Sequence, residues 1–331
     1  MTASSISNLG IQLLSTSNLQ GELTNINQLT EQLASGQQQD NLTNYSPLDA
    51  EQLLSFQNAI TQKQAYITTM QTVNARLQVY NSTMNDMENL AAEASQLATQ
   101  NPTLSTSQTG NIQEQVQAYM QQAVDDLNQQ IGDRYIYAGS RYSTQPVNLQ
   151  SVLNGTVTLP FTPVTPSGSN YPLPPYDTDY NSGNPSASNP DAWATASANI
   201  DTGDSLTYGV TSTQTGFQQL IAGMQLINNA AQNGVSAATY QTDMSNAATL
   251  LGSALTNIQT YNTGVASSIN TITQEKTTQN NDITSLQTQI GDIQNVDIAQ
   301  VGTELNTLQT QLQASYSATA ALTQDTLLKY L

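Results

Sequence analysis

Residues 296–331 read VDIAQVGTELNTLQTQLQASYSATAALTQDTLLKYL, and they carry a clear periodic pattern. Apolar residues recur alternately four and three positions apart, at Val301, Leu305, Leu308 and Leu312. This spacing is the heptad pattern of an α-helix with one narrow apolar stripe. In the same phase the stripe becomes small and polar at Ser315 and Thr319. A lone amphipathic helix of this kind is marginal in water, so the pattern predicts a partner that covers the stripe.

The first candidate partner lies at the opposite end of the chain. Apolar residues there show the same spacing, with polar Thr30 interrupting them. We therefore predict that the two termini pair with each other and then with further copies of the chain. The residues expected in this assembly interface are Leu19, Leu23, Ile26, Leu33, Val301, Leu305, Leu308, Leu312, Tyr316, Leu322, Leu327, Leu328 and Leu331.

The composition argues against most catalytic and nucleic-acid-binding roles. The 331 residues include no Cys and no His, which excludes disulfides, thiol nucleophiles, Cys/His metal sites and imidazole acid–base chemistry. Only 9% of residues are charged, and the net charge is −18. A basic surface for nucleic acid or for anionic membranes is therefore not expected. We expect no cofactor, no metal and no enzymatic activity, although a hydrolase that uses only carboxylates stays formally open.

The N-terminal sequence bears on where the protein is located, inside or outside the cell. No basic residue precedes Lys63, so the charged start of a cleaved secretory signal peptide is not expected. No uninterrupted apolar run approaches the roughly 20 residues that a membrane helix needs. Two alternatives stay open at this point: a cytosolic protein, or a protein exported without signal cleavage.

Long helices are predicted in both halves of the chain. Apolar residues spaced by threes and fours predict helices over about 4–35, 48–99, 107–130, 216–233 and 237–289. Gly36 and Pro47 are placed as the end of the first helix and the first turn of the second. A helix of about 50 residues is roughly 75 Å long, which is typical of a coiled-coil bundle rather than of a globular domain.

The middle of the chain has a different composition. Nine of the eleven prolines lie between Pro146 and Pro190. Short runs around Val152, Val157 and Phe161 predict strands between turns, so residues 146–212 are interpreted as a separately folded, β-rich insertion. The predicted organisation is an assembly helix (1–46), half of a helical bundle (47–145), the inserted outer domain (146–212), the other half of the bundle (213–289) and a second assembly helix (290–331).

Several motifs resemble the flagellin superfamily of bacterial flagellar axial proteins, and within it the hook-associated protein 3 family. The segment GDRYIYAGS at 132–140 is similar to that family's central turn, and we assign a structural role in it to Gly132, Arg134, Tyr135, Tyr137 and Gly139. The tail LQASY at 312–316 and LLKYL at 327–331 is similar to the family's ending. The resemblance covers residues 1–147 and 213–331. It implies a mainly α, elongated flagellin-like helical bundle, formed by the two terminal segments, with the inserted domain in the middle.

The resemblance also implies a function. It implies an exported, extracellular structural subunit of the bacterial flagellum, located at the hook–filament junction and active in motility through its paired terminal helices. Expected partners are copies of itself in a ring, hook-associated protein 1, flagellin and an export chaperone. A filament flagellin is the alternative, and a secreted coiled-coil adhesin is a further one.

Three groups of residues are candidates for chemical sites. Asp125 and Asp126 are adjacent in a helix, which does not build a paired-carboxylate site, and a solvated helix face is favoured. A segment beginning at Asp177 and Asp179 loosely resembles a calcium loop, also using Asn181 and Gly183, but a surface turn is favoured because Ser188 stands where Glu is needed. Arg134 and Arg141 are expected to pair with acidic residues rather than to bind an anion or catalyse a reaction.

Overall fold

The computed structural model describes residues 2–105, 107–180, 189–232 and 234–328. These residues form two compact units, one made of Met1–Gln62 with Asn280–Leu331 and the other of Lys63–Gln279. The described secondary structure is dominated by helices and includes only two small two-stranded sheets. The prediction of a mainly α fold is confirmed.

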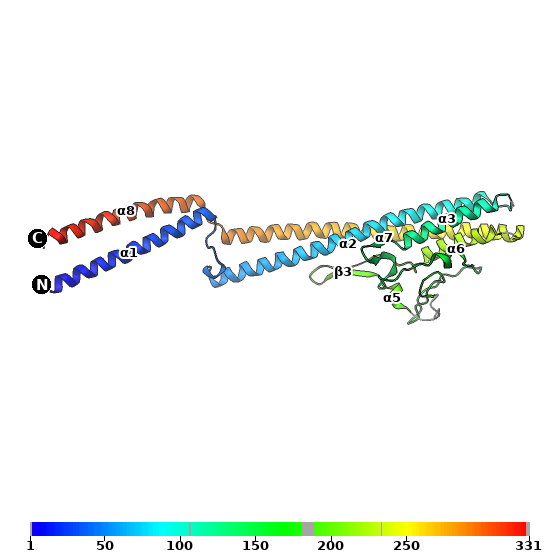
Figure 1. The fold of residues 1–331 in the computed structure, drawn as a ribbon, viewed down its shortest axis with the longest axis horizontal. Helices are drawn as coiled ribbons and strands as arrows, with labels where there is room; N and C mark the ends of the chain where they lie inside the picture. Colours follow the sequence, from blue (N-terminus) through cyan, green and yellow to red (C-terminus); the bar gives the residue numbers. More distant parts are fainter. Residues whose placement is uncertain (1, 106, 181–188, 233, 329–331) are drawn as a thin grey trace. The chain divides into compact units, whose positions relative to one another are not determined.

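The first unit joins the two ends of the chain. It contains α1 (Thr2–Ser35), the short 3-10 helix η1 (Leu42–Asn44) and α8 (Ile298–Leu328), together with the start of α2 (Pro47–Gln100) and the end of α7 (Ala237–Gln294). Helices α1 and α8 lie side by side (Figure 1). Gly36 ends α1 with a positive φ of 72°. Its carbonyl accepts a hydrogen bond of 3.0 Å from the N–H of Val296, and the N–H of Gln38 donates to the carbonyl of Gln294 at 2.7 Å.

Side-chain caps explain where three of the helices begin. The hydroxyl of Ser46 accepts from the N–H of Asp49 at 3.2 Å and donates to its carboxylate at 2.7 Å, which is a reciprocal cap at the start of α2. Ser236 accepts from the N–H of Thr239 at the start of α7. Asp297 accepts from two backbone N–H groups at the start of α8, at 2.9 and 3.1 Å. The helix bounds predicted from the sequence agree with these within a few residues.

The second unit is built on α2 and α7, which run antiparallel. Hydrogen bonds between the two helices join Lys63 to Gln279 at 3.0 Å and Asn81 to Asn262 at 2.8 Å. Just beyond the end of α2, the hydroxyl of Tyr240 donates to the carbonyl of Asn101 at 3.0 Å. Two shorter helices, α3 (Thr109–Leu127) and α6 (Thr215–Ala230), complete the bundle. The largest side chains with almost no exposed surface in this unit are Tyr137, Tyr240, Phe217, Met70, Leu77, Met84, Met87, Met120, Leu127, Leu220 and Ile221.

The predicted central turn is a tight hairpin followed by a buried aromatic cluster. Strands β1 (Gln130–Ile131) and β2 (Arg134–Tyr135) are joined by a two-residue loop in which Gly132 has a positive φ of 61°. The 3-10 helix η2 (Ile136–Ala138) then places Tyr137 in the core, edge-on to Tyr80 at 4.9 Å between ring centroids and to Phe217 at 5.5 Å. The Tyr137 hydroxyl lies 2.6 Å from that of Thr83. Burial raises the pKa of Tyr137 well above its usual value, so the phenol stays neutral.

The insertion contains less β structure than the sequence predicted. Its elements are α4 (Leu149–Leu153), α5 (Pro190–Trp193) and one hairpin of β3 (Ala196–Asp201) with β4 (Asp204–Tyr208). Val152 lies in a helix, and residues 155–166 form no strand and bend at 159–160. Prolines at 160, 163 and 166 remove the N–H groups that a regular ladder requires.

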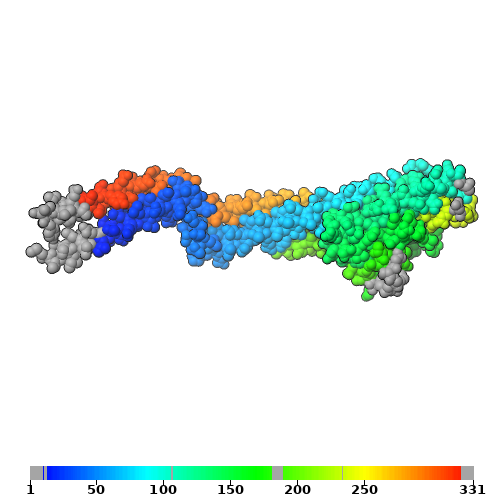
Figure 2. Space-filling model, viewed as in Figure 1, coloured from blue at the N-terminus to red at the C-terminus, as the bar shows by residue number. Residues whose placement is uncertain are grey.

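The insertion also shares the core of the bundle. Val147, Val152 and Tyr176 belong to the same cluster of buried residues as α2, α3, α6 and α7. In the space-filling view the green residues of the insertion lie directly against the cyan and blue-green helices (Figure 2). The expectation of a separately folded insertion is therefore wrong, because its buried side chains join the core of the helices instead of forming a core of their own. The five-part division of the chain stays a prediction about assembly.

We predict that Gly139→Ala destabilises the second unit by about 3 kcal/mol or more, because both strain and overlap act at this position. Gly139 has a φ of 65°, and a Cβ there would lie 2.4 Å from the carbonyl oxygen of Asp191. Gly132 also has a positive φ but has open space around it, so Gly132→Ala should cost only about 1 kcal/mol of strain. Urea unfolding followed by circular dichroism measures both; equal effects would contradict the role of the carbonyl contact.

Candidate assembly interface

The α8 side of the interface follows the predicted phase. Val301 is buried, and Leu305, Leu308 and Leu312 are half-buried in the first unit. The half-buried positions continue through Ser315 and Thr319, in the same four-and-three spacing. The heptad pattern of the sequence therefore identifies the face of α8 that meets α1.

The α1 side is rotated slightly from the predicted phase. Leu19 and Ile26 are half-buried as expected, but Leu23 and Leu33 are 40% and 37% exposed. The half-buried positions between the predicted ones are Glu22, Leu29 and Gln32, so from Leu19 to Leu29 the stripe follows three-then-four spacing. The sequence reasoning missed Glu22 because a carboxylate is seldom placed in a helix seam.

The distal part of the pairing is polar. The hydroxyls of Ser15 and Thr319 lie 2.9 Å apart, and Ser315 donates to a carboxylate oxygen of Glu22 at 3.3 Å. The other carboxylate oxygen of Glu22 is buried and makes no hydrogen bond within the described part of the chain. This end of the pair is therefore weakly stabilised, since an unsatisfied buried oxygen costs about 1–3 kcal/mol.

Apolar side chains stay exposed beside the paired face. Leu13 and Leu14 are each 64% exposed, and Tyr316, which the sequence placed in the interface, is 50% exposed and lies next to the α1–α8 contact rather than in it. The predicted interface residues Leu322, Leu327, Leu328 and Leu331 lie outside the residues whose side chains the structure describes. The pairing of α1 with α8 thus leaves apolar surface that a further molecule would cover.

The residues of the loose calcium-loop pattern have another partner. The guanidinium of Arg141 binds the carboxylate of Asp177 at 2.8 and 3.2 Å and also contacts that of Asp179. Burial lowers the pKa of Arg141, but its hydrogen bonds to Asp177 and Asp179 outweigh this and the pKa is raised overall. The ion pair occupies both carboxylates, so a calcium site is not supported here. Asn181 and Gly183 lie outside the described residues.

The expectation for the two arginines is met only for Arg141. It pairs with acidic residues of the insertion, with its own side chain 8% exposed and that of Asp177 fully buried. Arg134 instead lies over the ring of Tyr142, at 4.2 Å from the ring centroid, which is a cation–π contact. Within the described residues no group of three or more acidic side chains is arranged to hold a metal ion.

Asp126 does not lie on a fully solvated face as predicted. Asp125 is exposed, whereas Asp126 is half-buried on the side of α3 that faces inward. One carboxylate oxygen of Asp126 is buried without a hydrogen bond among the described residues. Burial, with added repulsion from Asp86 and Asp125, raises the pKa of Asp126 to about 7. Adjacent residues in a helix can differ this much because they point about 100° apart.

Comparison with protein families gives a match at the C-terminal end of the chain. Residues 248–331 match the model of the bacterial flagellin C-terminal helical region. This part of the chain is similar to the C-terminal helical region of bacterial flagellins. It includes most of α7 and all of α8, and therefore the α8 side of the interface described above.

Comparison with solved structures bears on the fold over about three quarters of the chain. A putative flagellar hook-associated protein from Vibrio parahaemolyticus superposes with a TM-score of 0.56 at 10% identity, covering 76% of this chain and 100% of that protein. FlgL from Bacillus cereus gives a TM-score of 0.40 at 15% identity, covering 82% and 97%. Hook-associated protein 3 from Legionella pneumophila gives 0.39 at 14%, covering 74% and 98%. Of these three, the Vibrio structure has a TM-score above 0.5, and at 10% identity this similarity shows a shared fold.

Together the flagellin C-terminal region and the fold confirm the resemblance to the flagellin superfamily that the sequence motifs indicated. No curated protein sequence matches the chain. None of the helices in the described residues combines the length and apolar character needed to span a bilayer.

We predict that Asp126→Asn stabilises the chain at pH 8 by about 1–2 kcal/mol, a value reduced for solvent screening of a half-buried group. The folded-state pKa of about 7 lies above the ordinary 3.8, so the native state binds the extra proton between these values. The wild type should therefore gain stability as the pH falls from 8 towards 4 through this group, and the variant should lack that gain. Urea midpoints at pH 5 and 8 test this, with the exposed Asp125→Asn as control; identical pH profiles for wild type and Asp126→Asn would contradict it.

Proposed function

We propose that this chain is a structural subunit of the bacterial flagellum, a hook-associated protein of type 3 that assembles at the hook–filament junction. The observation that carries the proposal is the flagellin C-terminal region at 248–331, folded as the second half of a terminal helix pair. The fold of a putative hook-associated protein supports it over the rest of the chain. A filament flagellin shares the same plan, and no feature of the described residues favours it.

The proposed mechanism is geometric. The paired α1 and α8 form one side of an interface whose exposed apolar residues, including Leu13, Leu14 and Leu23, are covered by neighbouring copies in a ring. Burial of such side chains against a neighbour stabilises by roughly 1.5–3 kcal/mol for each fully buried side chain. A ring held in this way connects the hook on one side to the filament on the other. The adjoining partners are then hook-associated protein 1 and flagellin.

The role is structural rather than catalytic, and it implies a location outside the cell. The subunit reaches the flagellum unfolded through the flagellar export channel, without signal cleavage and with the help of a chaperone. Absence of cysteine and the weak polar end of the terminal pair suit a chain that is threaded unfolded and orders its ends on assembly.

Deletion of the gene, followed by electron microscopy of the cell surface, tests the proposed position. We expect cells with hooks but without attached filaments, because flagellin has no junction on which to polymerise. Complementation with the full chain should restore filaments. Normal filaments in the deletion strain would contradict the proposal, and purified chain that polymerises alone into long filaments would assign it as flagellin instead.

We predict that Leu23→Asn blocks assembly while leaving the isolated chain as stable as the wild type, within about 0.5 kcal/mol. Leu23 is 40% exposed beside the seam, so its apolar surface is available to a neighbouring copy. Ile26→Asn, one turn away and half-buried against α8, should instead lower the stability of the first unit by about 1–2 kcal/mol. Motility of complemented cells and urea unfolding of the purified chains separate the two effects; wild-type motility with Leu23→Asn would count against this face as an interface.

A further inference from the structure

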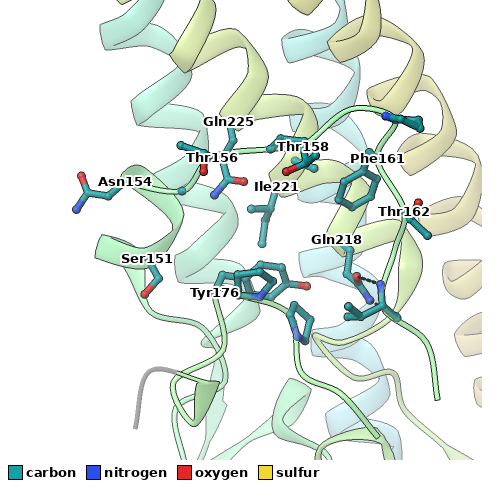
Figure 3. A pocket seen from close by; sticks show the side chains of 17 residues that line it. Ser151, Asn154, Thr156, Thr158, Phe161, Thr162, Tyr176, Gln218, Ile221 and Gln225 are labelled. Carbon is teal, nitrogen blue, oxygen red and sulfur yellow. Dashed lines mark hydrogen bonds between the residues drawn. The ribbon is translucent and has the colours of Figure 1, made fainter. Parts of the chain in front are cut away.

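Two hollows of the second unit differ in charge. The larger one, of about 710 Å³, is lined by hydroxyl, amide, apolar and aromatic residues, and none of its lining side chains carries a charge (Figure 3). The smaller one, of about 30 Å³, lies where α2 meets the hairpins β1–β2 and β3–β4. Its lining includes two of the six basic residues of the chain and four tyrosines: Arg76, Arg134, Tyr80, Tyr135, Tyr142 and Tyr208.

Neither arginine of the smaller hollow has a carboxylate partner among the residues that the structure describes. Arg76 donates to the hydroxyl of Tyr208 at 2.8 Å, and Arg134 lies over the ring of Tyr142. Arg141 of the same unit differs, because it binds two carboxylates of its own chain. A guanidinium carries five N–H donors, so most donors of Arg76 and Arg134 stay available. Their nitrogens are not among the buried unpaired atoms of the described residues, so the unused donors reach solvent.

The two positive charges act on the same place. The phenol of Tyr80 is buried in the lining of the hollow and donates to the carbonyl of Ile136. Burial raises the pKa of Tyr80, whereas Arg76 and Arg134 both act to lower it. Both guanidiniums are therefore close enough to one point to attract the same small anion. Without an anion the two like charges repel each other, and a negative group between them would replace that repulsion with attraction.

The size of the hollow restricts the kind of anion. A volume of about 30 Å³ holds roughly two atoms the size of a water molecule. This matches the two oxygens of a carboxylate, whereas a phosphate group needs more room. Guanidinium groups bind carboxylates through two parallel hydrogen bonds. A nucleic acid is also disfavoured, because the net charge of −18 repels a polyanion.

The charge of the chain favours a second copy as the source of the carboxylate. Each copy carries 24 acidic residues and only 6 basic ones. Glu93, Asp125 and Asp204 are among the exposed acidic residues of the second unit. Two copies that approach each other therefore repel unless an acidic side chain of one meets a basic site of the other. Tyr142, which is 48% exposed beside Arg134, adds an aromatic surface of the kind that stabilises protein interfaces.

We propose that Arg76 and Arg134 together bind an Asp or Glu side chain of a neighbouring copy, whose carboxylate lies between the two guanidiniums. This inference rests on the proposed function, because it names a contact between copies within the ring. The contact adds an ion pair in the second unit to the apolar contacts of the terminal helices. Charge complementarity of this kind sets the partner and the register more than the affinity.

Cross-linking in cells tests the contact directly. The deletion strain is complemented with Arg134→Lys, which keeps the positive charge and supplies a reactive amine. A carbodiimide activates the neighbouring carboxylate, and the amine then forms an amide bond with it while the urea by-product leaves. We expect a new band at twice the 35.5 kDa of the chain, in which mass spectrometry finds position 134 joined to an Asp or Glu. Cells with the wild-type chain control for links made by the natural lysines.

The matched control for the cross-link is Arg141→Lys. Its acidic partners lie in the same chain, so its product should stay at the position of the monomer. A link from position 134 to a different protein would overturn the proposal and assign the site to that protein. Links confined to one chain, or no link from position 134, would overturn it as well. A doubled band in cells whose deletion strain keeps normal filaments would instead support this contact and overturn the junction role.

Removal of the charge tests whether the ion pair contributes to assembly. We expect Arg134→Gln to lower the motility of complemented cells by half or more, because the carboxylate of the neighbour loses a charged partner. Lys276→Gln removes the same charge from α7 of the same unit and should leave motility as in the wild type. Near-ultraviolet circular dichroism of the purified chains checks that both variants are folded. Wild-type motility with a folded Arg134→Gln chain would show that the proposed pair does not act in assembly.

Discussion

The first unit depends on one long-range pairing, that of α1 with α8. Ser15 and Thr319 are separated by 304 positions in sequence, yet their hydroxyls lie 2.9 Å apart. Closing so long a loop costs more entropy than a local contact, although the cost rises only slowly with loop length. That entropy cost is offset because α2 and α7, which lie between α1 and α8 in sequence, run antiparallel and so bring the two ends of the chain together. The hydrogen bonds from Val296 to Gly36 and from Gln38 to Gln294 lie where those helices give way to the terminal pair.

The helices could be predicted from the sequence because their signals are local. Heptad spacing, the caps at Ser46 and Ser236, and the glycine at 36 each act over one or two turns. The phase of α8 followed from its leucines alone. The phase of α1 did not follow from its leucines, because its buried stripe includes Glu22. Only the hydrogen bond that Ser315 of α8 donates to this carboxylate shows why Glu22 is tolerated there. Likewise, the pKa of Asp126 is raised by burial and by repulsion from Asp86, which lies on a different helix, and neither cause has a local signature in the sequence.

The insertion was predicted least well because its order comes from contacts that are distant in sequence. Segment 156–162 has the alternation of a strand, but whether a strand becomes part of a sheet depends on a neighbour that the local sequence does not specify. Its position is fixed by the amides of Gln218 and Gln225 on α6, more than fifty residues away. Similarly, the two carboxylates that Arg141 contacts, those of Asp177 and Asp179, lie in a stretch whose sequence loosely resembles a calcium loop. A pattern of acidic residues cannot by itself distinguish an ion pair from a cation site.

The contrast between the two units connects the structure to assembly. The second unit buries a continuous core of aromatic, methionine and leucine side chains. The large apolar side chains buried in the first unit are few, namely Leu53, Ile283 and Val301 among the described residues. Exposed threonines of the first unit form hydrogen bonds within their own helices. The hydroxyls of Thr303 and Thr307, for example, donate to the carbonyls four residues earlier, so these side chains add little to packing between helices. A unit with few buried apolar contacts lies at the low end of local stability and opens first. In the assembly proposed above, an end with this little buried apolar surface would order where neighbouring copies cover it, whereas the well-packed second unit would fold without them.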